Sequence, residues 1–127
     1  MELLNLYKYK KPNINRIWLK KYNFTHQPNL SYGGEDVYFA FFPVYKWGDV
    51  TTLECRLTAL LPSGEIRIDV FDLNSGGSYA PFYWHDDNIH DSILARINKN
   101  IKNRLKKIGV KQVNENKKIK WFGKDAY

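Results

Sequence analysis

The segment from Asp86 to Gly109 constrains the fold most, because it carries the longest regular pattern in the chain and is marked at both ends. Residues placed 100° apart on a helix put six aliphatic side chains on one stripe. These are Ile93, Leu94, Ile97, Ile101, Leu105 and Ile108. Acids gather at the start and every charge after Asp91 in this segment is positive, which complements a helix dipole. The pattern predicts an amphipathic helix over 86–109, with Gly109 at the C′ position. The candidate N-caps are Asp86, Asp87 and Asn88.

The centre of the chain, residues 36–73, predicts an antiparallel β-meander. Its first part, residues 37–47, is apolar on both faces and predicts a strand that is covered on both sides. Pro43 lacks a backbone donor, so we expect a bulge or a sheet edge at that position.

The second part of the meander alternates cleanly between apolar and polar side chains. Residues 50–61 and 65–73 predict a hairpin, because residues 62–65 have turn chemistry. Pairing Leu61 with Ile66 keeps the aliphatic residues of both strands on one face, and we expect the helix stripe to pack there. On the other face this register gives the pairs Thr58–Asp69 and Arg56–Phe71.

The remaining segments are shorter and less regular. Residues 3–10 are a candidate strand, and Asn13 is a plausible N-cap for a short helix that reaches Tyr22. Residues 23–34 contain Pro28 and a glycine pair and are expected to form a loop. Residues 117–122 are a candidate fourth strand or a segment that docks beside the helix.

The expected fold is therefore α+β, in the order (β)αβββα(β). An antiparallel β-meander of three to four strands packs against a long C-terminal amphipathic helix, with a short N-terminal helix. At 127 residues, one domain is the default. Its parts are a basic N-terminal segment (1–35), the meander (36–73), the helix (86–109) and a basic C-terminal tail (110–127).

Charge is strongly segregated along the chain, although the net charge is only +7. Residues 31–91 hold an excess of acids, whereas residues 1–30 and 92–127 are basic. Lys99, Lys102 and Lys106 form one line opposite the aliphatic stripe, with Arg96 beside them. An exposed helix face normally mixes signs, and repulsion among these cations favours a partner that carries phosphates or carboxylates. The alternative is a solvated helix face, because lysines near a helix C-terminus are favourable by themselves.

Lysines alternate with aromatic residues near both ends of the chain. Single-strand nucleic-acid binders use this pairing, in which lysines contact phosphates and aromatic rings stack on bases. Trp18 lies in line with Ile14 and Tyr22, so we expect it to be a core anchor. The predicted binding residues are Arg96, Lys99, Lys102, Lys106, Lys117, Lys118, Lys120 and Trp121.

The polar face of the meander supports a weaker, catalytic alternative. A carboxylate base, arginines and a histidine acid would suffice to cleave RNA by attack of a 2′-hydroxyl, as small ribonuclease toxins do. The residues concerned are Glu54, Arg56, Arg67 and His85. The simpler interpretation is two cross-strand ion pairs on a solvated sheet face, and we expect no catalytic site.

Other classes of function find little support in the sequence. His85 and His90 are five residues apart and do not share a helix face, so we expect no metal, and we expect no other cofactor. The lone Cys55 and the lack of a signal-peptide or membrane-span pattern lead us to expect a cytoplasmic protein.

The sequence thus predicts a non-enzymatic interaction protein. Its partner is expected to be nucleic acid or the acidic surface of a nucleic-acid-handling protein, and no membrane. The richness in Asn, Lys, Ile, Tyr and Phe is what an AT-rich genome encodes, which suggests a phage or mobile-element accessory protein. A second alternative is a homo-oligomer in which the basic helix of one copy docks on the acidic sheet of the next.

Overall fold

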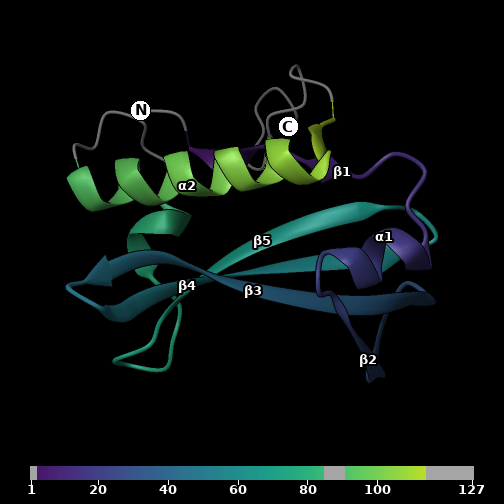
Figure 1. Ribbon diagram of the computed structural model, residues 1–127, viewed down its shortest axis with the longest axis horizontal. Coiled ribbons are helices and arrows are strands. Elements are labelled where there is room, and N and C mark those ends of the chain that lie inside the picture. Colours follow the sequence, from purple (N-terminus) through teal and green to yellow (C-terminus); the bar gives the residue numbers. More distant parts are fainter. Residues whose placement is uncertain (1–2, 85–90, 114–127) are drawn as a thin grey trace, which may run out of the picture.

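The structure, a computed structural model, describes residues 3–84 and 91–113. It is α+β, with one antiparallel sheet in the strand order β2-β3-β4-β5-β1-β6 and a C-terminal helix that lies across it (Figure 1). The six strands are β1 (Tyr9–Lys10), β2 (Thr25–Tyr32), β3 (Glu35–Trp47), β4 (Val50–Leu61), β5 (Glu65–Asp72) and β6 (Lys111–Gln112). The helices are α1 (Arg16–Lys21) and α2 (Ser92–Ile108), with the 3₁₀ turns η1 (Leu4–Leu6) and η2 (Ala80–Tyr83).

The strand count exceeds the predicted three to four because three strands lie outside the meander. Residues 25–32 form β2 at the edge of the sheet, where a loop was expected. Its ladder with β3 is interrupted around Pro28, which cannot donate a ladder hydrogen bond. The glycine pair that suggested a loop is the β2–β3 turn, since Gly33 and Gly34 both have positive φ. The other two, β1 and β6, are two residues long and pair with each other, and β1 also pairs with β5.

The β4–β5 register differs from the predicted one by two residues. Ala59 lies opposite Ile66 and Arg56 opposite Asp69, because the turn is wider than expected. In that turn the Gly64 N–H donates to the Leu60 carbonyl at 2.8 Å. A shift of two keeps every side chain on its predicted face, so the apolar face is preserved.

Strand β3 is covered on both sides only in its first half. The adjacent residues Val37 and Tyr38 point to opposite faces and are both buried, as predicted. Farther along, Phe41 is 54% exposed and Trp47 is 75% exposed, which corrects the prediction for that half of the strand. The predicted bulge at Pro43 is confirmed, because the β3–β4 register shifts between Pro43 and Tyr45.

Both helices start later than predicted. In α1 the N-cap is Asn15, whose side chain accepts a hydrogen bond from the Trp18 N–H, and Asn13 instead has a left-handed backbone. In α2 the N-cap is Asp91, whose carboxylate accepts from two backbone N–H groups. The three predicted caps at 86–88 lie outside the described residues, but the helix begins at Ser92 and so needs none of them. Gly109 ends α2 in the left-handed conformation, as predicted.

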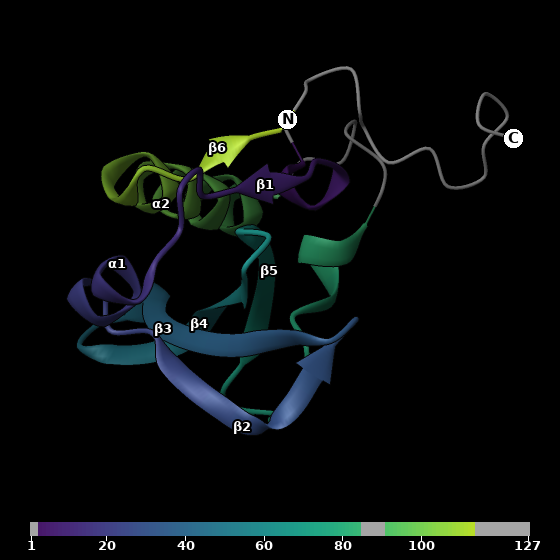
Figure 2. The same ribbon diagram turned by 90° about the vertical axis from the view of Figure 1, so that its right-hand side faces the viewer.

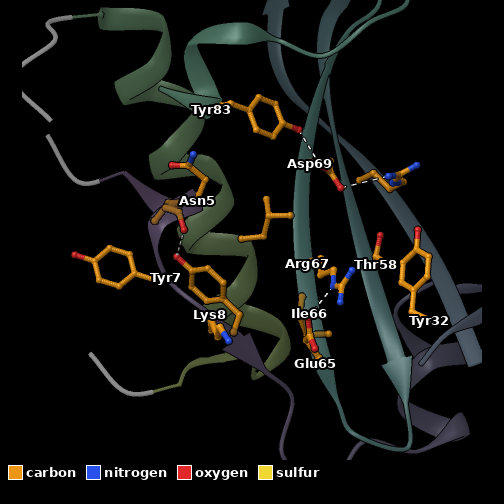
Figure 3. A pocket seen from close by; sticks show the side chains of 14 residues that line it. Asn5, Tyr7, Lys8, Tyr32, Thr58, Glu65, Ile66, Arg67, Asp69 and Tyr83 are labelled. Atoms are coloured by element: carbon orange, nitrogen blue, oxygen red, sulfur yellow. Dashed lines mark hydrogen bonds and ion pairs between the residues drawn. The ribbon is translucent and has the colours of Figure 1, made fainter. Parts of the chain in front are cut away.

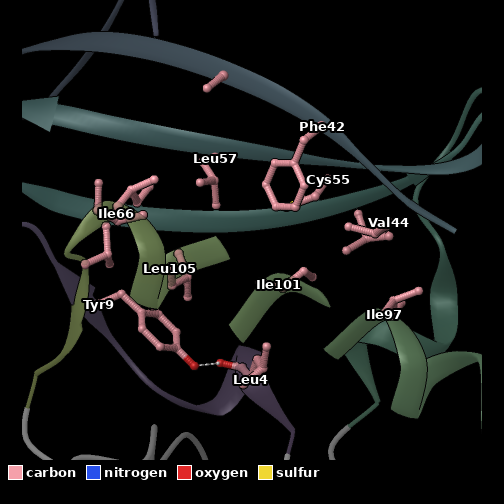
Figure 4. Packing of buried hydrophobic residues seen from close by; sticks show 14 of the residues in the cluster. Leu4, Tyr9, Phe42, Val44, Cys55, Leu57, Ile66, Ile97, Ile101 and Leu105 are labelled. Carbon is pink, nitrogen blue, oxygen red and sulfur yellow. Dashed lines mark hydrogen bonds between the residues drawn. The ribbon is translucent and has the colours of Figure 1, made fainter. Parts of the chain in front are cut away.

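The main core lies between α2 and the apolar face of the sheet, with β1 and β6 curling beside the helix (Figure 2). Ile97 and Ile101 are fully buried in α2, as the aliphatic stripe predicts. Figure 4 shows them facing side chains of β3 and β4, with Tyr9 and Leu105 at the other end of this core. Residues of the sheet that line this core include Phe42, Val44, Leu53, Cys55, Leu57, Ala59, Ile66 and Val70.

Candidate functional site

The outer half of α2 is a cationic surface. No acid occurs between Ser92 and Val113, and Lys99, Lys102 and Lys106 are all exposed. Because the aliphatic stripe holds the opposite side of the helix in the core, these ammonium groups face solvent. The helix dipole favours only the cations of the last turn, so it stabilises Lys106 but not Lys99.

The two short strands extend this cationic surface. β1 and β6 place Lys10 directly opposite Lys111, and both side chains are exposed. Like charges directly opposite one another destabilise a strand pair. A hollow of about 280 Å³ beside this pair is lined by Lys102, Lys106 and Lys111. We call Lys10, Lys99, Lys102, Lys106 and Lys111 the lysine surface.

The predicted binding residue Arg96 lies on a different side of α2. It lines a hollow next to β3, and its guanidinium carbon lies 5.7 Å from the centre of the Tyr45 ring. The predicted binding residues of α2 therefore do not lie on one side of the helix. Arg96 lies on the side that faces β3, and Lys102 lies on the side that faces β6.

A second cationic strip, along β3, was missed from the sequence. Arg104 lies over the Phe42 ring at 4.4 Å, and the Asn100 side-chain amide donates to the Val44 carbonyl at 2.9 Å. Val44 is the bulge residue of β3 and has no partner on β4. The sequence signal was the spacing of four residues that joins Arg96, Asn100 and Arg104 on one helix side.

The N-terminal part of the Lys/aromatic pattern is mainly structural. Trp18 stacks with Phe24 at 5.1 Å between ring centres, and its indole N–H donates to the Ile108 carbonyl at 2.9 Å. This confirms its role as a core anchor that ties α1 to the end of α2. The predicted tail residues Lys117, Lys118, Lys120 and Trp121 lie outside the described residues.

Of the alternative catalytic residues, two arginines come together at one cavity. This cavity of about 610 Å³ lies between β5 and the N-terminal segment and is lined by Arg56 and Arg67 (Figure 3). Each guanidinium is already engaged, Arg56 by Asp69 at 3.3 Å and Arg67 by Glu65 at 2.7 Å. Only the first is the cross-strand pair that the simpler interpretation expected, since the second lies within β5.

The other two alternative catalytic residues do not join this cavity. Glu54 lies on β4 opposite Phe71 and is not among the residues that line it. His85 lies outside the described residues. The described residues therefore place no histidine and no unpaired carboxylate next to the two arginines.

Arg56 is the centre of a layered cluster on the sheet. Its guanidinium carbon lies 4.4 Å from the centre of the Phe39 ring and 5.0 Å from that of Phe71. The Tyr83 hydroxyl donates to Asp69 at 2.8 Å, so one carboxylate holds both a cation and a phenol. Such a network fixes the arginine in place and is typical of structural ion pairs.

Tyr83 should make stability depend on pH above neutrality. Burial, helped by the hydrogen bond to Asp69, raises the pKa of its hydroxyl to about 12. The contribution is complete below the unfolded-state pKa of about 10 and is lost as pH rises through the folded value. We expect the wild type to lose about 1 kcal/mol more than Tyr83→Phe between pH 8 and about pH 12, the full shift being reduced by solvent screening. Urea unfolding at both pH values measures this, and equal losses would contradict the account.

Other kinds of site receive no support from the part of the chain that the structure describes. In residues 3–84 and 91–113, no three His, Cys, Asp or Glu side chains gather where they could hold a metal ion. No helix within these residues is long and apolar enough to cross a bilayer. Burial raises the pKa of the Cys55 thiol well above its ordinary value, which disfavours its reactive thiolate.

Comparisons with protein-family models, with curated proteins and with solved structures find no match to this chain.

Proposed function

We propose that this protein binds nucleic acid through the lysine surface and is not an enzyme. The observation that carries the proposal is the placing of Lys10 opposite Lys111, next to two further lysines of α2. Folding brings these like charges together from three separate segments, although their repulsion opposes the fold. A polyanion removes that repulsion, and phosphates are the groups that lysine contacts in nucleic acids.

The rest of the molecule supports binding over catalysis. The arginines of the cavity at β5 are engaged by carboxylates, which leaves them poorly placed to stabilise a developing charge on a substrate. The segment from Ser92 to Val113, which carries four of the five lysines of the lysine surface, contains no acid. Nucleic acid is favoured over an acidic protein because Lys99, Lys102 and Lys106 follow α2 as a row of point charges, which suits regularly spaced phosphates.

The salt dependence of binding tests this proposal. If the lysine surface contacts about four phosphates, log affinity should fall against log salt with a slope near −3 to −4. Between about 50 and 200 mM salt this is a loss of roughly 10²-fold. Fluorescence anisotropy with a labelled oligonucleotide, single-stranded or duplex, measures the slope. A slope near zero, or no binding at the lowest salt concentration, would overturn the proposal.

A further inference from the structure

The side of α2 that faces β3 differs in chemistry from the lysine surface. Arg96, Asn100 and Arg104 are spaced four residues apart and so form a row along the helix. Two adjoining hollows of about 270 and 280 Å³ follow this row, and both are lined by Pro43 and Asn100. The hollows lie between α2 and β3, because residues of both elements line each of them. We call them together the arginine groove.

The polar side chains of the arginine groove are held in place before any ligand arrives. The guanidinium carbon of Arg104 lies 4.4 Å from the centre of the Phe42 ring, and that of Arg96 lies 5.7 Å from the centre of the Tyr45 ring. Asn100 is tied to the Val44 carbonyl. Side chains that are already ordered lose less conformational entropy when a ligand binds. A guanidinium is also planar, so it can stack on a nucleic-acid base.

Point charges lie at both ends of the arginine groove. Lys46 lines the hollow that contains Arg96, and Lys107 lines the hollow that contains Arg104. The helical rise from Arg96 to Lys107 is about 16 Å, which is enough for a short run of nucleotides. The groove thus combines planar stacking groups with terminal cations, the two features that single-strand binders combine.

We propose that the arginine groove holds a single strand of nucleic acid, whose bases stack on Arg96 and Arg104 while Lys46 and Lys107 contact its phosphates. This proposal rests on the proposed function and adds that the protein prefers single-stranded to double-stranded nucleic acid. The bases of a duplex are already stacked and paired with one another, so they are not available to stack on Arg96 and Arg104. Single strands therefore gain contacts that a duplex does not.

The double variant Arg96→Lys and Arg104→Lys separates stacking from charge. It keeps both positive charges but removes both planes, so single-strand affinity should fall at least about tenfold. Duplex affinity should stay within about twofold, and the salt slope should not change, because the charge is the same. The matched control is Arg67→Lys, since Arg67 also lies over a ring, that of Tyr32 at 5.0 Å, but lines the cavity at β5. This control should leave both affinities unchanged.

Arginine modification of the wild type gives a second test that does not depend on how the variants fold. A single-stranded oligonucleotide should protect Arg96 and Arg104 from phenylglyoxal, whereas Arg67 should react as in the free protein. A duplex should protect neither groove arginine.

The outcomes distinguish this proposal from the one on which it rests. Salt-dependent binding with equal single-strand and duplex affinities, unprotected groove arginines, or equal losses for both polymers in the double variant would overturn the groove assignment alone. Absence of binding to either polymer would overturn both proposals.

Discussion

Replacing Gly64 with alanine should lower the free energy of unfolding by about 3 kcal/mol, through a left-handed backbone and a steric clash together. Gly64 has φ of 83°, and a Cβ atom built there would lie 2.5 Å from the Lys11 carbonyl oxygen. That oxygen belongs to the backbone, so the chain at β1 must move away. The Lys11 N–H also donates to the Gly64 carbonyl at 2.8 Å, and this bond leads into the pairing of β1 with β5.

Gly48→Ala is the matched control for this prediction. Gly48 also has a positive φ, of 64°, but nothing lies within 4 Å of a Cβ built there. Gly48→Ala should therefore lower the free energy of unfolding by only about 1 kcal/mol, which is the cost of a left-handed backbone without a steric clash. Urea unfolding of both variants measures the difference, and equal losses would show that β1 is not held tightly against the Gly64 turn.

Replacing Lys99, Lys102 and Lys106 together with glutamine should weaken nucleic-acid binding by about 10²-fold, as three phosphate contacts are lost. The salt slope should become shallower by about 2 to 3. All three side chains are exposed on one side of α2, so we expect stability to change by less than about 1 kcal/mol. The variant thus removes charge from the lysine surface without removing the core contacts of the helix.

The elements with regular hydrophobic patterns could be predicted from the sequence. The aliphatic stripe of α2 and the alternation of β4 and β5 reflect burial on one face, which each segment encodes by itself. The register of the hairpin could not be predicted, because shifts of two residues keep the same faces. That shift has a chemical consequence, since it pairs Arg56 with Asp69 and not with Phe71.

The missed elements depend on contacts that no local pattern records. β6 was not predicted, and of the candidate strand 3–10 only Tyr9–Lys10 pairs as β1, because Leu4–Leu6 form a 3₁₀ turn. Both strands are two residues long and depend on distant segments that meet at this side of the sheet. β2 is largely exposed and contains Pro28, so it lacks the apolar alternation of a covered strand. The start of α2 was ambiguous because several acids precede it, and any of them could have capped a helix.

The residues of the candidate site also differ in whether a local sequence pattern could predict them. The lysines of α2 were found because the charge pattern of a helix is local. Arg104 and Asn100 were missed because only the packed structure shows that their side of the helix lies against β3. The pairing of Lys10 with Lys111 also needs the fold, because the two residues are far apart in the sequence.

The most direct test of the central claim compares the affinity of two variants with equal net charge for one labelled oligonucleotide at low salt. One is the triple glutamine variant of Lys99, Lys102 and Lys106. In the other variant, glutamate replaces three exposed residues of β2, namely Thr25, Asn29 and Ser31. We predict a loss of about 10²-fold for the first variant and at most a few-fold for the second. Equal affinities of the two variants would mean that overall charge, and not the lysine surface, governs binding, and would contradict the account.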